Sequence, residues 1–326
     1  MIRLKRLCAA MLLLSLALYA GCAAPRQGVG AQKPFVAVIV KSTGSSFWKS
    51  VKAGANAAAS EYNFGFSFDG PLSEEDYEGQ NRMIGDAVAA GADAIVLSAI
   101  DFSGTAEAVE RAAAAGVKIV VIDSDVDSDQ VAVRIGTDNY AAGREAGLAV
   151  LGGEENTLRI GVIGFDVHTK NGQEREQGFE DAIAEDSRAE IVETVNTSSD
   201  SETAQKATRD LLTRHPEINA VVTFNELTTL GVGHAIGELG LGGTVRAVGF
   251  DNNVVSVGML ETGEIDVLIV QNPFAIGYLG VENAGLLASG KTPSADRIDT
   301  EVRAIDREGM YSDENQKFLF SFTENQ

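Results

Sequence analysis

Cysteine and histidine, which often supply nucleophiles and metal ligands, are scarce in this sequence of 326 residues. The two cysteines, Cys8 and Cys22, leave the rest of the chain without a thiol for a disulfide, a metal cluster or a nucleophile. The three histidines stand outside every spaced metal-binding motif. We therefore expect no metal and no other cofactor.

Basic residues are also few. The 26 lysines and arginines stand against 47 aspartates and glutamates, which gives a formal charge of −21. A surface this acidic disfavours binding to nucleic acid or to anionic lipid by charge, and its simplest use is solubility outside the cell. We therefore expect no nucleic-acid partner.

Long apolar runs are confined to the start of the chain. The basic segment MIRLKR precedes LCAAMLLLSLALYA, which is too short to span a bilayer comfortably. Residues 1–21 are therefore predicted to be a signal peptide and are excluded from the fold. The sequence YAGC resembles a bacterial lipobox, in which Cys22 is lipidated and becomes the mature N-terminus. Tyr19 departs from the usual leucine, and simple secretion is the alternative.

The segment after the lipobox, residues 22–33, consists mainly of small and polar residues, which is typical of a flexible tether. With a lipidated Cys22, the protein would be held at the cell membrane. We expect it to lie outside the cytoplasm, either in a periplasm or on the cell surface.

From Phe35 onward, short β-rich runs alternate with helical stretches. The run FVAVIV is followed by SSFWKSVKAGANAAASEY, and AIVLSA is followed by SGTAEAVERAAAAG. The same order returns where RIGVIGFD precedes NGQEREQGFEDAIAED and NAVVTFN precedes LTTLGVGHAIGEL. Near-continuous apolar strands separated by helices indicate parallel sheets covered on both faces. The sequence therefore predicts an α/β fold of two similar lobes.

Polar side chains end the predicted strands in both halves. Ser98 and Asp123 end successive strands of the first half, and Asn225 and Asp251 do so in the second. Gln271 ends a further strand. Ligands of open α/β sheets bind beyond the carboxyl ends of the strands. Two facing halves would therefore form a cleft lined by these side chains.

These side chains suit a sugar, which presents hydroxyl groups and an apolar C–H face. Carboxylates and amides can bond paired hydroxyls, and flat aromatic rings can cover the C–H face. The adjacent Phe47 and Trp48 follow the first strand, at the start of a predicted helix. We expect at least one of the two rings to line the cleft. The alternative is that both are core residues of that helix.

Patterns that would indicate other chemistry are incomplete. GVGHAIG places its third glycine one residue late for a dinucleotide-binding fingerprint, which favours helix-packing glycines. DSDVDSD resembles a calcium loop beginning at Asp123, but Ser128 and Arg134 stand where that loop needs Gly and Glu. No spacing singles out a catalytic pair of carboxylates. We therefore expect that the protein is not an enzyme.

The chain resembles the ribose-type periplasmic sugar-binding proteins of ABC transporters, also called periplasmic binding proteins of type 1. The resemblance covers about residues 34–300 and rests on GSSFWKSVKAGA, VIDSD, GTDNYAAGREAG, NGQEREQGFEDAI, LLTRHPEINAVVTFNE, AVGFDNN and VLIVQNPFAIGYLGV, in that order. It implies a ligand cleft between two lobes and a hinge of three strands that closes over the ligand.

The resemblance places the three hinge crossings after about Thr137, Gln271 and Asp299. The predicted domains follow from these crossings. The N-terminal lobe comprises residues 34–137 and 272–299, and the C-terminal lobe comprises residues 138–271 and 300–326.

The resemblance also implies a set of ligand-binding residues. Two arginines of the family are replaced by Ser124 and Gln173, and an aromatic residue that closes the sugar face aligns near Ser199. These departures argue against ribose in particular and against an anionic ligand. Lys41, at the end of the first strand, and Asn171 are further candidates. The predicted ligand-binding residues are Lys41, Ser45, Phe47, Trp48, Asp123, Ser124, Asn171, Gln173, Asn225, Asp251 and Gln271.

These observations predict a lipid-anchored, monomeric receptor that captures a neutral monosaccharide or similar polyol and delivers it to an ABC permease. One alternative is a sensor subunit that presents its ligand to a membrane signalling receptor. Sugar-responsive repressors share the two-lobed fold, but they begin with a helix-turn-helix, whereas this chain begins with an export signal. An enzyme is the third alternative.

Overall fold

Two six-stranded sheets organise the chain. The computed structural model describes residues 33–153 and 155–320. The predicted signal peptide, the lipidation site Cys22 and all but the last residue of the predicted tether lie outside the described residues. Within the described part of the chain, no helix is long and apolar enough to cross a membrane.

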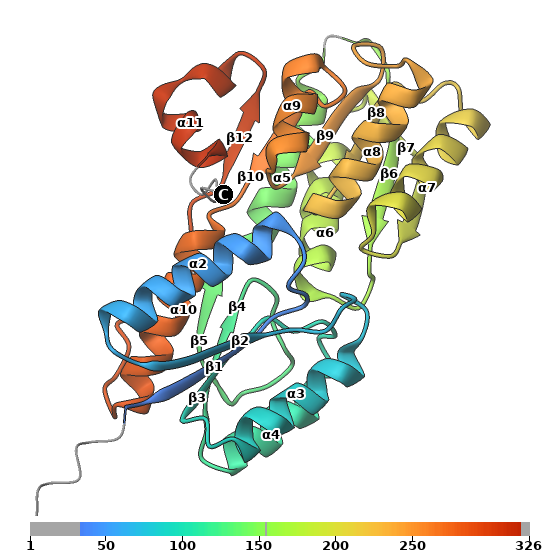
Figure 1. Cartoon of the computed structure of the whole chain (residues 1–326). Coiled ribbons are helices and arrows are strands. Elements are labelled where there is room, and N and C mark those ends of the chain that lie inside the picture. The colour runs from blue at the N-terminus through green and yellow to red at the C-terminus, as the bar shows by residue number, and fades with distance from the viewer. Residues whose placement is uncertain (1–32, 154, 321–326) are drawn as a thin grey trace, which may run out of the picture. The chain divides into compact units, whose positions relative to one another are not determined.

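The first sheet is parallel throughout, with the strand order β11-β5-β4-β3-β1-β2. Its strands are β1 (Phe35–Ile39), β2 (Gly65–Asp69), β3 (Ala94–Leu97), β4 (Lys118–Ile122), β5 (Val131–Gly136) and β11 (Arg297–Asp299). One face is covered by α2 (Ser46–Glu61) and α10 (Pro273–Ala288), and the other by α3 (Tyr77–Ala89) and α4 (Ala106–Ala114), as Figure 1 shows. We call this sheet and its four helices the first lobe.

The second sheet has the strand order β12-β10-β9-β8-β6-β7. Its strands are β6 (Leu158–Phe165), β7 (Ala189–Thr197), β8 (Ala220–Thr223), β9 (Arg246–Phe250), β10 (Val267–Val270) and β12 (Arg303–Asp306). Its helices are α5 (Asn139–Leu151) and α6 (Lys170–Ala184) on one face and α7 (Ser201–Arg214), α8 (Glu226–Leu239) and α9 (Val254–Thr262) on the other. A 3₁₀ turn (Gly309–Tyr311) and α11 (Asp313–Leu319) follow β12. These elements form the second lobe.

The predicted fold of two parallel-sheet lobes is confirmed, with one exception at an edge of the second sheet, where β12 pairs with β10 in the antiparallel direction. The chain enters β12 directly from the hinge, at the cleft end of the second sheet. β12 therefore runs away from the cleft, whereas β10 has its carboxyl end at the cleft. The remaining pairs of the second sheet are parallel, as predicted.

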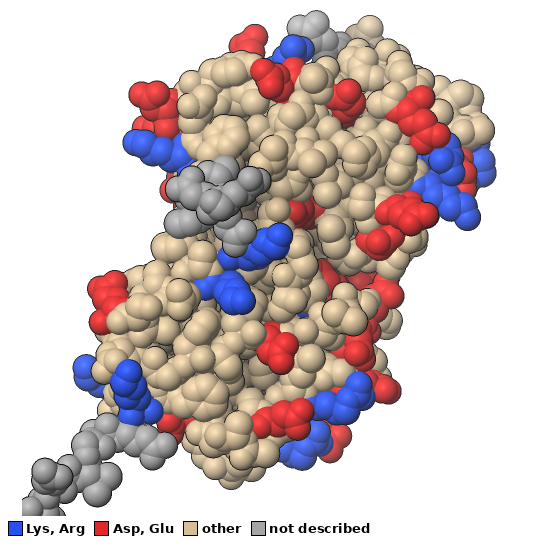
Figure 2. All heavy atoms as spheres, viewed as in Figure 1, with Lys and Arg blue, Asp and Glu red and all other residues tan. Residues whose placement is uncertain are grey.

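The strands read as continuous apolar runs because helices cover both of their faces. All four residues of β3, β8 and β10 are buried. Each lobe therefore has two hydrophobic clusters, one on either side of its sheet. On the face drawn in Figure 2, acidic side chains are scattered singly and in small groups among uncharged surface.

The segments that connect the lobes lie side by side. The Thr137 hydroxyl donates to Gln271 Oε1 at 2.7 Å, and the Thr300 amide donates to the Gly136 carbonyl at 2.7 Å. The predicted crossings fall where β5, β10 and β11 end. The exact lobe boundaries stay a prediction.

Candidate functional site

A cavity lies between the two lobes at the carboxyl ends of their strands. Together with its mouth, it holds about 340 Å³ of empty space. It is lined by Lys41, Ser45, Phe47, Trp48, Glu74, Asp123, Phe165, Asn171, Arg175, Ser199, Asn225, Glu226, Leu227, Asp251 and Gln271. Four of these residues end or directly follow a strand, and three more lie two residues beyond one, which is the location expected for a ligand in open α/β sheets.

The aromatic pair enters the cavity from the first turn of α2. Ser45 caps this helix, and its hydroxyl accepts a hydrogen bond from the Trp48 amide at 3.4 Å. Phe47 and Trp48 meet edge to face, with ring centroids 4.9 Å apart. Both rings line the cavity, yet they are only 8% and 2% exposed and belong to a core cluster of the first lobe. They therefore combine the two roles that the sequence offered as alternatives.

The indole of Trp48 is held by a carboxylate. Its Nε1 donates to Glu74 Oε1 at 2.7 Å, and the Ser42 hydroxyl donates to the same oxygen at 3.1 Å. Glu74 lies in the loop between β2 and α3. The orientation of the ring is thus set by a hydrogen bond as well as by packing.

The two strand-end aspartates share an unusual backbone conformation. Asp123 has a φ of 57° and Asp251 a φ of 65°, in the left-handed region that non-glycine residues rarely occupy. Each still donates its amide to the neighbouring strand, to Ile135 and Ile269 respectively. Aspartate tolerates this region better than most residues, and strain of this kind concentrates at functional sites. The turn directs both carboxylates into the cavity.

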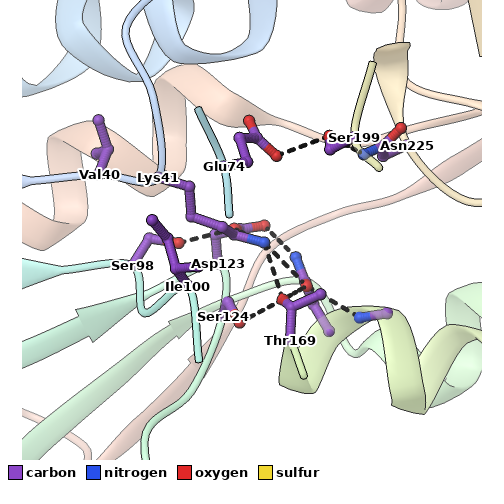
Figure 3. A network of polar contacts seen from close by, with 12 residues as sticks. Val40, Lys41, Glu74, Ser98, Ile100, Asp123, Ser124, Thr169, Ser199 and Asn225 are labelled. Carbon is purple, nitrogen blue, oxygen red and sulfur yellow. Dashed lines mark hydrogen bonds and ion pairs between the residues drawn. The ribbon is translucent and has the colours of Figure 1, made fainter. Parts of the chain in front are cut away.

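The Asp123 carboxylate accepts hydrogen bonds from both lobes. Ser98 Oγ donates to its Oδ2 at 2.9 Å, and Asn171 Nδ2 donates to its Oδ1 at 3.0 Å. The Lys41 ammonium lies 3.7 Å from Oδ2. Lys41 also reaches Thr169 Oγ1 at 3.0 Å and Asn171 Oδ1 at 3.1 Å, so it joins the first lobe to α6 (Figure 3).

Arg175 forms the floor of the cavity from the second lobe. Its guanidinium is almost fully buried and donates to Asn139 Oδ1, the Phe224 carbonyl and Gln271 Oε1 at 2.8–2.9 Å. It lies 4.8 Å from the centre of the Phe250 ring. Burial lowers the pKa of Arg175, and the charges of Asp251 and Asp123 oppose that shift.

Asp251 is buried with fewer partners than Asp123. Gln271 Nε2 donates to its Oδ1 at 2.6 Å. Burial raises the pKa of Asp251 to about 7, although the Arg175 charge and the Gln271 hydrogen bond act in the opposite direction. A ligand hydroxyl that donates to this carboxylate would stabilise its charged form.

Asn225 belongs to a chain of hydrogen bonds that joins the two lobes through Ser199 and Glu74. It caps α8, with its Oδ1 accepting from the Thr228 amide at 2.9 Å, and its Nδ2 donates to Ser199 Oγ at 2.7 Å. The Ser199 hydroxyl donates to Glu74 Oε2 at 3.0 Å, which completes a bridge over the cavity (Figure 3).

Nine of the eleven predicted ligand-binding residues line the cavity; their contact with a ligand stays a prediction. Ser124 and Gln173 are placed elsewhere. Ser124 is fully buried and its hydroxyl pairs with Thr169 Oγ1 at 3.0 Å. Gln173 is exposed and donates to the Val167 carbonyl, because residues 171 and 175 share the helix face that meets the cavity, whereas residue 173 points away.

Several cavity residues were not in the predicted set, namely Glu74, Phe165, Arg175, Ser199, Glu226 and Leu227. Phe165 ends β6, so the strand-end rule could have found it. Arg175 stands one helical turn after Asn171, which is also a readable signal. Glu74 and Glu226 lie far along the chain from the residues they meet, and no local pattern marks them.

The cavity can bind a polyhydroxylated molecule but has an excess of negative charge. Its carboxylates are Glu74, Asp123, Glu226 and Asp251, and its cations are Lys41 and Arg175. Both cations approach Asp123, at 3.7 and 3.9 Å. Among the described residues, no group of three or more His, Cys, Asp and Glu side chains is placed to hold a metal ion.

Comparisons with known proteins agree with this geometry. A sequence model described as "Periplasmic binding protein domain" matches residues 36–292. The D-ribose/D-allose-binding protein of Pseudomonas aeruginosa is 27% identical over 287 residues, which cover 84% of this chain and 89% of the relative. The ribose import binding protein of Bacillus subtilis is 25% identical over 295 residues, 88% of this chain and 95% of the relative.

Solved structures show the same similarity. A carbohydrate transporter solute-binding protein from Agrobacterium radiobacter, in complex with D-arabinose, has a TM-score of 0.85 and 28% identity and covers 89% of this chain and 99% of its own. An ABC transporter solute-binding protein from Agrobacterium vitis, with bound D-fucose, has a TM-score of 0.84 and 30% identity and covers 87% of this chain and 99% of its own.

Proposed function

This chain belongs to the periplasmic binding protein domain family, which consists of solute-binding proteins rather than enzymes, and we propose that its cleft captures a neutral monosaccharide or similar polyol for an ABC permease. The observation that carries this proposal is the convergence of an aromatic pair with carboxylates and amides from both lobes on one cavity. Aromatic faces suit the C–H side of a sugar ring, and the polar groups suit its hydroxyls.

The named relatives support the class of ligand. The two curated relatives are named for ribose and allose, and the two solved structures contain D-arabinose and D-fucose. All four are monosaccharides without a formal charge. The excess of carboxylates in the present cavity would repel a sugar acid or a sugar phosphate. Lys41 and Arg175 are already committed to hydrogen bonds with protein atoms.

The setting of the receptor is part of the proposal. We infer a monomer that is exported, lipidated at Cys22 and held at the outer side of a membrane by residues 22–33. The YAGC sequence after an apolar run supports this inference. The membrane partner would be the permease of an ABC transporter.

The test is a thermal-shift screen of the purified protein against a panel of neutral pentoses, hexoses and polyols, followed by titration calorimetry. A ligand at about 100 times its dissociation constant stabilises the folded state by about 2.7 kcal/mol, which a melt detects readily. D-Gluconate and D-ribose 5-phosphate serve as anionic controls. A panel in which no neutral sugar shifts the melt would contradict the proposal.

A sensor that presents the same sugar to a membrane signalling receptor is the second candidate. One related solved structure, described as a XylFII–LytSN complex, has a TM-score of 0.79 and 26% identity to this chain. That structure shows a chain of this fold assembled with a second protein. Co-purification of the sugar-loaded protein with detergent-solubilised membranes distinguishes the candidates, because the partner is a permease in one case and a receptor in the other.

A further inference from the structure

The carboxylate of Glu226 joins the two lobes, and both of its oxygens accept hydrogen bonds from protein groups. Glu226 is the first residue of α8 in the second lobe. Its Oε1 accepts from the Ser46 amide at 3.1 Å, and its Oε2 accepts from the Phe47 amide at 2.9 Å. Both amides belong to the first turn of α2 in the first lobe. Asn253 Nδ2 also donates to Oε1, at 2.9 Å.

Glu226 supplies a negative charge at the N-terminus of α2. The first amides of a helix have no partner within the helix and carry partial positive charge, so a carboxylate is favourable there. The first turn of α2 contains no acidic residue of its own. Glu226 therefore caps a helix of the opposite lobe. The residue is only 6% exposed to solvent.

The N-termini of three helices surround the Glu226 carboxylate, and their positive ends strengthen its hydrogen bonds to α2. Glu226 lies in the first turn of α8, and Asn253, which donates to it, is the N-cap of α9. The positive ends of α2 and α8 would repel each other if they met without an anion. In the other bridge between the lobes in this region, from Ser199 to Glu74, the carboxylate accepts from side chains and from no amide of a helix start. Charge-assisted hydrogen bonds are roughly twice as strong as neutral ones.

We propose that Glu226 is a positioning residue that closes the cleft before any sugar is bound, by capping α2 from the second lobe. The benefit of this closure depends on the proposed function, because it concerns sugar binding. The test does not depend on it, because it measures closure in the absence of sugar. A protein that already populates its binding-competent closed form binds ligand with an affinity that is less reduced by the closing step. The capped turn also carries Phe47 and Trp48, so closure and placement of the aromatic pair occur together.

The test measures the distance between the lobes in the absence of ligand. Spin labels are placed at Leu72→Cys and Glu202→Cys, in the Cys22→Ser background, because the chain then has no other thiol beyond its signal peptide. Leu72 is fully exposed in the first lobe, and Glu202 is exposed in the second, close to Ser199. Unfolding and refolding on a column removes any sugar carried from the cell. The decisive variant is Glu226→Gln, which keeps the size of the side chain and removes its charge.

We expect the ligand-free parent to show a substantial short-distance population. In Glu226→Gln, the ratio of closed to open molecules should fall about tenfold, the order expected when a helix N-terminus loses its carboxylate. The matched control is Glu238→Gln, the same substitution at the exposed end of the same helix, which should leave the distribution unchanged. Thermal melts of both variants verify that they are folded.

A parent that is fully open without ligand, or a Glu226→Gln distribution equal to that of the parent, would overturn the proposal. If no sugar of the panel binds but Glu226→Gln still lowers the closed population, the role of Glu226 in closure is supported and the proposed sugar ligand is contradicted. If a panel sugar binds, Glu226→Gln should release it about tenfold faster with little change in its association rate. If Glu226 had a purely structural role, Glu226→Gln would instead lower the melting temperature and leave the ratio of the dissociation rate to the association rate unchanged.

Discussion

The most informative residues of the site are the two aspartates that directly follow β4 and β9. Both adopt a left-handed backbone conformation and both direct a carboxylate into the cavity. Asparagine adopts this region at least as readily as aspartate, whereas alanine would add backbone strain. Substitution by asparagine therefore isolates the role of the charge at Asp123 and Asp251.

The first prediction concerns Asp251→Asn. The amide keeps an acceptor for Gln271 but loses the charge, so we expect binding of the panel sugar to weaken by roughly 1.5–3 kcal/mol. The melting temperature of the empty protein near neutral pH should stay the same or rise, because a buried charge has been removed. Titration calorimetry and a melt check both expectations. Asp129→Asn, at an exposed position, is the control, and unchanged affinity in Asp251→Asn would remove Asp251 from the site.

The second prediction concerns pH. The pKa of Asp251 is raised from 3.8 to about 7 in the folded protein, so between these values the folded state holds a proton that the unfolded state has lost. Stability of the empty protein should therefore fall as pH rises from about 4 to about 7, by an amount on the order of a few kcal/mol, and then level off. The difference between wild type and Asp251→Asn in urea unfolding isolates this contribution.

Sugar affinity should change in the opposite direction, because ligand hydroxyls donate to the ionised carboxylate. We expect wild-type affinity to rise through pH 7, and Asp251→Asn to show no such rise. An identical pH dependence of affinity in both proteins would contradict this assignment.

The third prediction concerns Trp48, which is the only tryptophan in the chain. Its indole is buried in the core of the first lobe and also lines the cavity. Trp48→Ala should therefore lower the free energy of unfolding by about 3–5 kcal/mol and weaken sugar binding as well. Trp48→Phe should lose less of both. In the wild type, indole emission should change saturably with the panel sugar; an emission that ignores a bound sugar would place the ring in the core alone.

At the scale of elements, the position of α2 determines where the aromatic pair lies. This helix crosses α10 so closely that a Cβ on Gly54 would lie 2.0 Å from the Phe274 carbonyl oxygen, and one on Gly277 would lie 2.0 Å from the Val51 carbonyl oxygen. The two glycines allow the backbones to touch. α2 then presents its first turn to the cleft.

The fourth prediction is that Gly54→Ala forces α2 away from α10. We expect a loss of roughly 1–3 kcal/mol in unfolding free energy, with weaker sugar binding because Phe47 and Trp48 move with the helix. Gly85→Ala is the matched control, since a Cβ there meets nothing within 4 Å in the middle of α3. It should stabilise the protein by about 0.5–1 kcal/mol. Equal melts for the two variants would argue against close packing of α2 on α10.

At the scale of the whole molecule, the lobes meet through contacts between residues far apart in the chain. Lys41 reaches α6, Glu74 reaches Ser199, and Glu226 reaches α2. Two of these contacts depend on carboxylates, and closure of the cleft buries all of them together. Some of the acidic residues of this chain thus hold the two lobes together at the cleft.

The fifth prediction concerns attachment of the molecule to a membrane. Cys22→Ser should release the protein from the membrane fraction into the periplasm or the medium, because the lipidated side chain would be absent. Cell fractionation with immunoblotting measures this, and Cys8→Ser, within the predicted signal peptide, is the control. A Cys22→Ser protein that remains wholly in the membrane fraction would refute the lipobox.

The sequence by itself determined the two-lobed α/β fold and most of the cavity lining. Strand periodicity and turn position are local properties, and parallel strands bring their carboxyl ends to one edge of a sheet. The sequence alone therefore places Asp123, Asn225, Asp251 and Gln271 at the cleft. The resemblance to a family added Ser45 to the lining and the three hinge crossings. It also implied Ser124 and Gln173, which do not line the cavity, because a resemblance transfers positions and not the direction in which a side chain points.

Only the tertiary structure decided which residues meet across the cleft. Glu226 and Phe47 are separated by 179 positions, and Glu74 and Ser199 by 125, so no periodicity in the chain relates them. The left-handed turns at Asp123 and Asp251 are likewise invisible in the residue pattern, since aspartate occupies ordinary conformations far more often. Contacts of this kind arise from how the two packed lobes dock, and that depends on the shape of each lobe as a whole.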